Sequence, residues 1–440
     1  MRSSRNHLFA LSLVCLGTLL VVYVTDKVVK NRNTRDVNTD CDCSKNNVPP
    51  NPEMTNPAAC DRDPRDDSHV NPLSKFYSVW YDQPTEKTLT KRDHANILIW
   101  TDLWDDQLKK KLPTGTGTMC PTMPGCIFSK YHDKIHEADA VLFEVSNLQK
   151  DYNPSVMPTV RFPHQHWIWF HTECPNFPSI NFETYRSVFN WTITYRSDSD
   201  SSGAWGSLYR TYQRLKVEGV DPKKDYTVGK KKLAVWFISK CNTQANRVAY
   251  ATELVKHMHV DVFGRCGKSV CAKWNVTCMP GIIRQYKFYL AFENMKCKEY
   301  LTEKFWRNAL ANDVIPVVLG ANRSDYERLA PPHSYIHVDD FKSPKELADH
   351  LKMLGQDKEQ YNAYFKWKTQ PPKNMPLEEG VWCNLCREIF ERCPTKRKLY
   401  TDLRLWFEGE HLSMCDPLEN VKHQKLQFVD DHFQVATYTD

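Results

Sequence analysis

Short runs of apolar residues recur along the chain, with polar segments between them. In the first half these runs cover residues 95–100, 138–145, 167–170 and 189–195, and each is short enough to be a buried strand. Strands separated by polar or helical segments are typical of an α/β layer with a mostly parallel sheet. We therefore predict one such domain over residues 91–215.

The same pattern continues after a basic, turn-rich link. It predicts strands and βαβ units built on residues 231–239, 260–263, 289–292, 315–319 and 335–338. We assign residues 216–400 to this second domain, so the fold class is α/β, with two Rossmann-like domains that face a cleft. Residues 401–440 are expected to add a helix packed across the two domains and a loose tail.

The N-terminal segment is longer and more uniformly apolar than any of these runs. Residues 8–25 are just long enough to span a thin bilayer, behind a short cytoplasmic tail of residues 1–7. We interpret them as an uncleaved signal-anchor, because no small-x-small cleavage site stands out; a cleaved signal peptide is the alternative. Residues 26–90, rich in Asn, Asp and Pro at their start, are predicted to form an extended stem.

Composition indicates a globular protein. Hydrophobic residues make up 41% of the 440, and the net charge of +6 is not concentrated in one basic block, which gives no support to a nucleic-acid partner. Asn-x-Ser/Thr sequons agree with a lumenal location, and they stand at Asn190, Asn275 and Asn322. Asn190 lies inside a strand-like segment, where burial would prevent its glycosylation.

Sixteen cysteines are many for a cytosolic enzyme and favour an oxidising compartment. Disulfides are a better interpretation than zinc for Cys266, Cys271, Cys278 and Cys297. The Cys383-x-x-Cys386 pair looks more like a zinc knuckle, with Cys393 and Cys415 as candidate partners, but bridging is favoured there too. Cysteines of the stem could pair locally or join two chains into a disulfide-linked homodimer, and these are Cys41, Cys43 and Cys60. With Cys15 in the membrane, fifteen remain, so at least one is unpaired or intermolecular.

The most informative stretch for chemistry begins at Phe292, at the end of a predicted strand. Thr302 is placed to cap a helix whose first turn carries Glu303 and Lys304. Free N–H groups at a helix start and a lysine favour anions, while a carboxylate accepts hydrogen bonds from sugar hydroxyls. This place suits a nucleotide diphosphate.

The same stretch resembles the signature of the α1,3-fucosyltransferases, which runs F-E-N-S, a tyrosine, T-E-K-x-x-N-A and then V-P-V-V-L-G. The similarity extends over about residues 95–368, and Met295 replaces the serine usual in the family. It implies the GT-B type of glycosyltransferase fold and a GDP-fucose donor. On the same basis the donor-binding residues are Arg247, Asn294, Tyr300, Glu303 and Lys304, with Arg247 and Lys304 on the diphosphate, Tyr300 and Glu303 on the ribose, and Asn294 on the donor side of the cleft.

A candidate base follows the third predicted strand. Glu173 stands where a carboxylate at the carboxyl end of a parallel strand faces the ligand crevice. From residue type alone an exposed loop carboxylate is favoured. The family's W-x-W and proline around its catalytic glutamate match Trp167, Trp169 and Pro175, which implies that Glu173 is the general base.

The block after the fourth strand also resembles the family. Its Asp198-x-Asp200 looks like the Asp-x-Asp box with which other glycosyltransferases hold a divalent metal. Because the resembled family is metal-independent, we assign four residues here to loop shaping or acceptor contacts, namely Tyr195, Arg196, Asp198 and Asp200. We expect no metal site and no required cofactor, with a divalent cation such as Mn²⁺ at most a stimulant.

The resemblance implies inverting transfer of L-fucose from GDP-β-L-fucose in α1,3 linkage to N-acetylglucosamine of glycoprotein N-glycans. The cysteines near Cys266 and Cys297 favour the innermost (core) N-acetylglucosamine; outer-arm LacNAc or LacdiNAc is the alternative, and an inactive glycan-binding Golgi protein is the rival class. We expect a single-pass type II Golgi membrane protein with a lumenal catalytic domain. The count of Lys and Arg around the span favours the opposite orientation, but cysteines, sequons and the resemblance outweigh it.

Overall fold

The computed structural model of the protein describes Leu73 and residues 94–103, 115–148, 156–175, 180–241, 247–271, 277–375, 379–391, 399–410, 413–416, 424–429 and 432–437. Within these ranges no helix has the length and apolar character that crossing a membrane requires. The predicted membrane segment, residues 8–25, lies outside them. Leu73, within the predicted stem, is buried in the hydrophobic cluster that contains Trp167 and Trp169.

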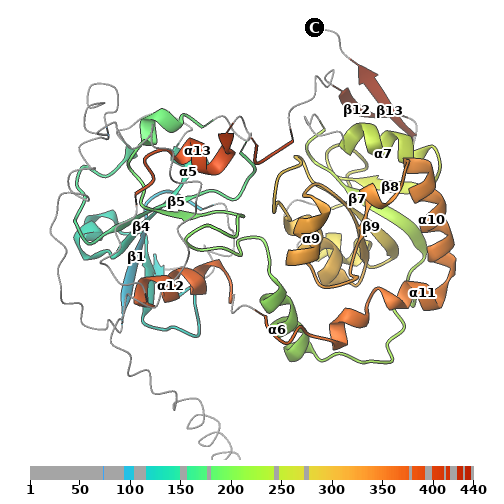
Figure 1. The fold of residues 1–440 in the computed structure, drawn as a ribbon, viewed down its shortest axis with the longest axis horizontal. Coiled ribbons are helices and arrows are strands. Elements are labelled where there is room, and N and C mark those ends of the chain that lie inside the picture. Colours follow the sequence, from blue (N-terminus) through green and yellow to red (C-terminus); the bar gives the residue numbers. More distant parts are fainter. Residues whose placement is uncertain are drawn as a thin grey trace, which may run out of the picture. The chain divides into compact units, whose positions relative to one another are not determined.

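The first sheet of the described chain has 6 strands in the order β2-β3-β1-β4-β5-β6 (Figure 1). The strands are β1 (Ala95–Ile99), β2 (Thr116–Gly117), β3 (Cys126–Ser129), β4 (Ala140–Glu144), β5 (His166–Phe170) and β6 (Trp191–Ile193). All pair in parallel except β2, which is antiparallel to β3. The sequence pattern missed β2 and β3, because they are very short and lie in a segment rich in Thr, Gly and Pro.

The second sheet is 5-stranded and parallel throughout, in the order β11-β10-β9-β7-β8. Its strands are β7 (Lys232–Phe237), β8 (Val260–Phe263), β9 (Tyr286–Phe292), β10 (Ile315–Leu319) and β11 (Ile336–His337). Each apolar run interpreted as a strand overlaps an observed one in the two sheets.

Both sheets share one topology. Numbered along the chain, the parallel strands of each follow the spatial order 2-1-3-4-5. This is the second common strand order of doubly wound α/β folds. The order of strands reverses between β1 and β4 in the first sheet and between β7 and β9 in the second, and ligands of such folds bind beside the carboxyl ends of strands at this switch point.

Helices accompany both sheets. The α-helices are α5 (Val145–Leu148), α6 (Leu208–Glu218), α7 (Arg247–Val255), α8 (Cys278–Ile283), α9 (Arg323–Leu329), α10 (Pro344–Gln356), α11 (Lys358–Ala363), α12 (Val381–Glu391) and α13 (Leu403–Glu408). Short 3-10 turns cover His132–Glu137, Phe182–Tyr185, Leu310–Asn312, Val338–Asp340 and Lys366–Thr369, and a π-helix covers Lys304–Ala309.

Each sheet is buried on both faces, as its continuous apolar strands require. One face of the first sheet packs on α13 and the other on α12. In the second sheet one face packs on α7, α10 and α11, and the other on α6, α9 and the π-helix. Successive residues of a strand therefore belong to different cores, as with Val235 and Trp236 of β7.

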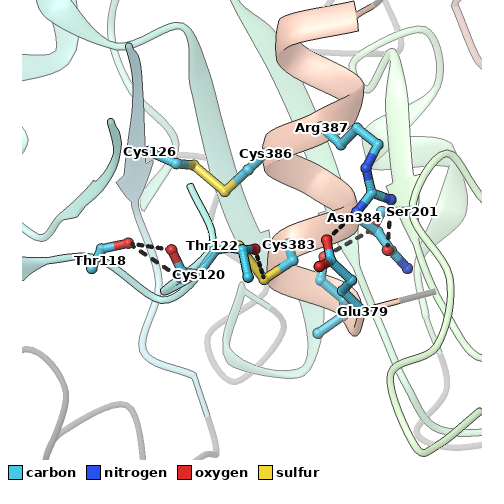
Figure 2. The surroundings of a disulfide bond; sticks show 11 residues. Thr118, Cys120, Thr122, Cys126, Ser201, Glu379, Cys383, Asn384, Cys386 and Arg387 are labelled. Carbon is cyan, nitrogen blue, oxygen red and sulfur yellow. Dashed lines mark hydrogen bonds and ion pairs between the residues drawn. A yellow bond between two sulfur atoms is a disulfide. The ribbon is translucent and has the colours of Figure 1, made fainter. Parts of the chain in front are cut away.

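The segment around α12 packs on the first sheet, although we had placed residues up to 400 with the second. Two disulfides join it to that sheet, Cys120–Cys383 and Cys126–Cys386 (Figure 2). Asn384 also donates a hydrogen bond to the Ser202 carbonyl (3.3 Å). Both cysteines of the Cys383-x-x-Cys386 pair thus bridge to the first half of the chain, and the candidate partners Cys393 and Cys415 were wrong.

The C-terminal extension is also more ordered than predicted. After α13, residues 424–429 and 432–437 form an antiparallel hairpin, β12 (Gln424–Val429) and β13 (His432–Thr437), where we expected a loose tail. The described chain contains three further disulfides, Cys241–Cys266, Cys271–Cys278 and Cys297–Cys415. The preference for disulfides over zinc is confirmed at these positions, whereas Cys15, Cys41, Cys43, Cys60 and Cys393 lie outside the described residues.

Candidate functional site

The switch point of the second sheet gathers charged residues. Lys240 follows β7 and Arg247 begins α7, while Glu293 and Asn294 follow β9 directly. Because β7 and β9 are neighbouring parallel strands, these residues lie at the same edge of the sheet. A ligand that carries both negative charge and hydroxyl groups would find cations and hydrogen-bonding groups together here.

Glu293 is the centre of this network. Its carboxylate is fully buried and accepts hydrogen bonds from the Thr302 backbone N–H (2.9 Å), from the Thr302 hydroxyl (2.8 Å) and from Lys304 Nζ (2.8 Å). Burial raises the pKa of Glu293, and Lys304 opposes that rise. The carboxylate therefore joins the end of β9 to the start of the following helix.

That helix differs from the regular one we predicted. Thr302 does begin it, since its carbonyl accepts the N–H groups of Phe305 and Trp306, but residues Lys304–Ala309 then form a six-residue π-helix. Glu293 already occupies the Thr302 N–H. This donor is therefore not open to an anion, and the anion site at the start of the helix stays a prediction.

Lys304 is held between two carboxylates. Its ammonium lies 2.8 Å from Glu293 Oε2, 3.3 Å from Glu303 Oε1 and 2.9 Å from the Thr302 hydroxyl, which occupies all three of its N–H directions. Burial opposes the charge on Lys304, but Glu293 and Glu303 outweigh it and raise the pKa of Lys304. Burial likewise opposes ionisation of Glu303, but Lys304, Thr302 and Arg307 together outweigh it and lower the pKa of Glu303. The site thus holds a charged lysine between two carboxylates.

Gly320 is required by the same network. Strands β9 and β10 pair with Phe292 opposite Leu319, so Glu293 and Gly320 come next to each other at the ends of the strands. A Cβ on Gly320 would lie 2.8 Å from Glu293 Cγ and 2.9 Å from Glu293 Cβ. Only glycine leaves room for the buried carboxylate.

Arg247 is 3% exposed and binds the backbone at the ends of two strands. Its Nη1 donates to the Phe292 carbonyl (3.0 Å) and its Nη2 to the Lys240 carbonyl (3.1 Å). Burial lowers the pKa of Arg247 to about 10, which leaves it charged at neutral pH. Its Nε has no hydrogen-bond partner in the described chain, so that N–H is among the guanidinium donors that the protein leaves unused.

Glu173 belongs to the first sheet, in the loop after β5. Its Oε2 accepts a hydrogen bond from the hydroxyl of Tyr300, which comes from the second sheet (3.1 Å). Beside it, Asn294 Nδ2 donates to Cys174 Sγ (3.7 Å). The structure thus brings the predicted base into contact with the predicted donor-binding residue Tyr300, and the neighbouring Cys174 into contact with Asn294. Tyr300 is 1% exposed and its hydroxyl is directed to Glu173, so its predicted ribose contact stays a prediction.

Cys174 is the free cysteine of the described residues, and it is buried. Burial, with a smaller contribution from Glu173, raises the pKa of Cys174 to about 12. The group next to the candidate base is therefore a neutral thiol.

The Tyr195 to Asp200 block shapes its own loop. Arg196 binds Asp198 through two nitrogens (2.8 and 2.6 Å) and covers the ring of Trp406 (4.4 Å). Asp200 is buried and accepts from the Thr192 N–H (2.9 Å) and from the Tyr400 hydroxyl (2.9 Å). Asp198 and Asp200 therefore have separate partners, and the described residues hold no cluster of at least three His, Cys, Asp or Glu side chains fit for a metal.

The three sequons differ in accessibility. Asn190 is fully buried, and its Oδ1 accepts the Trp167 N–H (2.6 Å), which leaves no room for a glycan on the folded protein. Asn322 is exposed before α9. Asn275 lies outside the described residues.

Several residues of the site were not selected from the sequence. In the sequence, Glu293 was noted only as part of the family motif and Thr302 only as a helix cap. An acidic residue directly after a buried strand is nevertheless a signal that could have identified Glu293. Trp205, whose indole N–H donates to the Thr172 carbonyl (2.9 Å), gave no signal, because the contact joins segments that are distant in sequence.

Comparison with known proteins supports one family. Residues 92–206 match the family model described as fucosyltransferase, N-terminal, and residues 227–406 match the C-terminal model of glycosyltransferase family 10 (fucosyltransferase). Glycoprotein 3-alpha-L-fucosyltransferase A of Drosophila melanogaster is 34% identical over 366 residues, 83% of this chain and 69% of its own.

Mammalian relatives and one solved structure are also similar. Alpha-(1,3)-fucosyltransferase 7 of Mus musculus is 33% identical over 76% of this chain and 81% of its own. The 4-galactosyl-N-acetylglucosaminide 3-alpha-L-fucosyltransferase FUT6 of Pan troglodytes is 39% identical over 71% and 82%. A crystal structure of an alpha1,3-fucosyltransferase with GDP-fucose covers 74% of this chain and 98% of its own, at 18% identity and a TM-score of 0.45. The chain therefore belongs to glycosyltransferase family 10, the fucosyltransferases, and is a glycosyltransferase.

Proposed function

We propose that this enzyme transfers L-fucose from GDP-β-L-fucose in α1,3 linkage, with inversion, to N-acetylglucosamine of glycoprotein N-glycans. One observation carries the proposal: Tyr300 and Asn294, from the sheet that bears the cations, contact Glu173 and Cys174 of the other sheet. A base and a cationic donor site thereby adjoin each other. The names of the relatives reported above, all 3-alpha or alpha-(1,3) fucosyltransferases, support the linkage.

The mechanism requires one displacement. Glu173 accepts the proton of the acceptor 3-hydroxyl while that oxygen attacks C1 of fucose, and the bond from C1 to the GDP oxygen breaks. The β-linked donor thereby gives an α-linked product. Base catalysis of this kind typically accelerates a reaction by roughly 10²- to 10⁴-fold.

The departing GDP carries negative charge that the protein has to stabilise. We assign this role to Arg247, through its unpartnered Nε, and to Lys304, which would exchange one of its present partners for a phosphate oxygen. Glu303 would accept a ribose hydroxyl, and Asn294 would line the donor side. No metal is required in this scheme, with Mn²⁺ at most a stimulant, so transfer should persist in EDTA.

Two classes of acceptor compete in this proposal. The core N-acetylglucosamine is supported by the Drosophila relative, whose name specifies a glycoprotein and whose match covers 83% of the chain. Outer-arm N-acetylglucosamine is supported by the relative named as a 4-galactosyl-N-acetylglucosaminide enzyme, at 39% identity over 71%. We favour the core.

The location follows from the same proposal. A glycoprotein fucosyltransferase with disulfides belongs in the secretory pathway, and we propose a single-pass type II Golgi protein anchored by residues 8–25. A homodimer linked through the stem cysteines is a further proposal. Non-reducing electrophoresis of the full chain would test it.

The experiment for the whole proposal uses the full-length chain with GDP-fucose and defined N-glycans. One acceptor should offer only the core N-acetylglucosamine, and another only galactosylated outer arms. We expect mass spectrometry of the products to find one added deoxyhexose on the core, both with and without EDTA. Fucose on the outer arms alone would select the alternative acceptor, and hydrolysis or binding of GDP-fucose without transfer would contradict the proposal.

A further inference from the structure

The loop after β9 leaves the second sheet and enters the core of the first. Met295, Cys297 and Tyr300 are each buried, and they pack in the same hydrophobic cluster as Trp169 of β5 and Phe407 of α13. Residues of the donor-side loop thus form part of the support of the strand that carries Glu173. Packing therefore links the position of the loop to the position of Glu173.

The C-terminal segment fastens this loop. Lys298 N–H donates to the Met414 carbonyl and Asp416 N–H to the Lys296 carbonyl, both at 2.8 Å, and the disulfide Cys297–Cys415 lies between these bonds. Two backbone hydrogen bonds and a covalent bond leave the loop little freedom.

The same C-terminal segment covers the strand that carries the base. The ring of Phe407 packs edge-on against Trp169 of β5, with centroids 4.7 Å apart. The segment therefore contacts the strand before Glu173 and the loop that carries Tyr300, which are the two elements joined by the Tyr300–Glu173 hydrogen bond.

Tyr300 itself is suited to orient a carboxylate. Its ring packs edge-on against Tyr195, with centroids 4.9 Å apart, and its hydroxyl reaches Glu173 Oε2 at 3.1 Å. Burial, together with the negative charge of Glu173, raises the pKa of Tyr300 well above its ordinary value, so the hydroxyl stays protonated and donates. A hydrogen bond to the charged form of an acid stabilises that form.

We infer that Tyr300 is a positioning residue for Glu173, and that the C-terminal segment holds it in place through Cys297–Cys415. This inference rests on the proposed role of Glu173 as the base. Because Oε2 is occupied by the tyrosine, proton transfer from the acceptor falls to Oε1. The same hydrogen bond fixes the orientation of the carboxylate before the acceptor arrives.

The test is Tyr300→Phe in the full-length enzyme, with kcat and the KM for GDP-fucose measured separately. Loss of the hydrogen bond that orients the carboxylate should lower kcat by about tenfold. The KM for GDP-fucose and the affinity for GDP should stay within about twofold. Tyr326→Phe is the matched control, because the Tyr326 hydroxyl is buried and has no hydrogen-bond partner in the described chain.

A second variant removes the disulfide that holds the loop. Cys297→Ser with Cys415→Ser should lower kcat by a smaller factor, and it carries the test if Tyr300→Phe does not fold. An unchanged kcat would overturn the inference, and a large loss of GDP affinity with an unchanged kcat would in addition make Tyr300 a donor contact. Glu173→Gln separates the two proposals: an active Glu173→Gln enzyme refutes the base itself, whereas an inactive one beside a Tyr300→Phe enzyme of unchanged kcat refutes only the positioning role.

Discussion

The two sheets of this enzyme have the same strand order, but the groups at their carboxyl ends are held in different ways. In the second sheet Glu293, Thr302, Lys304 and Gly320 belong to one stretch of chain and fix one another directly. In the first sheet Glu173 is bound by Tyr300, which is 127 residues away in sequence.

The difference separates a local site from an assembled one. A local network of charges forms whenever its own strand, loop and helix form. An assembled carboxylate depends on partners that arrive from other elements and on the disulfides that hold those elements. We therefore expect lesions in the second sheet to act directly on charge, and lesions in the first to act through packing.

The largest loss of stability is expected at the local network. Lys304→Met leaves the buried Glu293 carboxylate without its cation, and breaking a buried pair in this way typically costs about 3–5 kcal/mol. GDP affinity should fall together with the free energy of unfolding, measured by denaturant titration. Lys352→Met, which removes an exposed ion pair with Asp349, is the control and should change stability by less than about 1 kcal/mol. Equal effects of both variants would contradict the buried network.

The stability of the first sheet should depend on a disulfide to a segment that is distant in sequence. Replacing Cys120 and Cys383 by serine opens one of two disulfides that attach α12 to the sheet. Because Cys126–Cys386 still closes nearly the same long loop, the loss should be at the lower end of the usual range, about 2–3 kcal/mol. Removing both disulfides should lower the free energy of unfolding clearly more than removing one. An unchanged unfolding free energy would show that α12 does not depend on them.

A smaller effect is expected from crowding the local network. Gly320→Ala places a methyl group against the Glu293 side chain, and overpacking of this kind costs about 1–3 kcal/mol. Gly281→Ala in α8 is the control, since a Cβ there meets nothing within 4 Å, and it should be neutral or slightly stabilising. If Gly320→Ala is also neutral, the strand ends are looser than the pairing of β9 and β10 indicates.

The same contrast explains what the sequence could predict. The buried strands are short apolar runs, and the Glu303–Lys304 pair stands beside its own strand, so pattern and motif suffice for them. The partners of Cys383 and Cys386, the attachment of α12 and α13 to the first sheet and the Tyr300–Glu173 contact arise from long-range packing. No local periodicity encodes such contacts.

One local prediction was wrong for a local reason. The residues after Thr302 form a π-helix in place of the regular helix that we predicted, and the Thr302 N–H is bound by Glu293.

The smallest effect concerns reactivity rather than stability. With its pKa raised to about 12, Cys174 is almost wholly a thiol at pH 8, and only the thiolate reacts with iodoacetamide. We expect slow alkylation of the native enzyme, with a rate that keeps rising as the pH approaches 12, and rapid alkylation after denaturation. Peptide mass spectrometry would follow the reaction. A rate that levels off near pH 9 in the folded enzyme would contradict a buried thiol beside Glu173.

The most direct test of a single site built from both sheets is Glu173→Gln, assayed for fucosyl transfer and for GDP binding in the same preparation. We predict that kcat falls by roughly 10²- to 10⁴-fold while GDP affinity is retained, because the base and the cations lie on different sheets. Glu183→Gln, at an exposed position of the 3-10 turn Phe182–Tyr185, should leave both unchanged. Transfer at a near-normal rate by Glu173→Gln, or parallel loss of transfer and GDP binding, would contradict the assignment of Glu173 as the base.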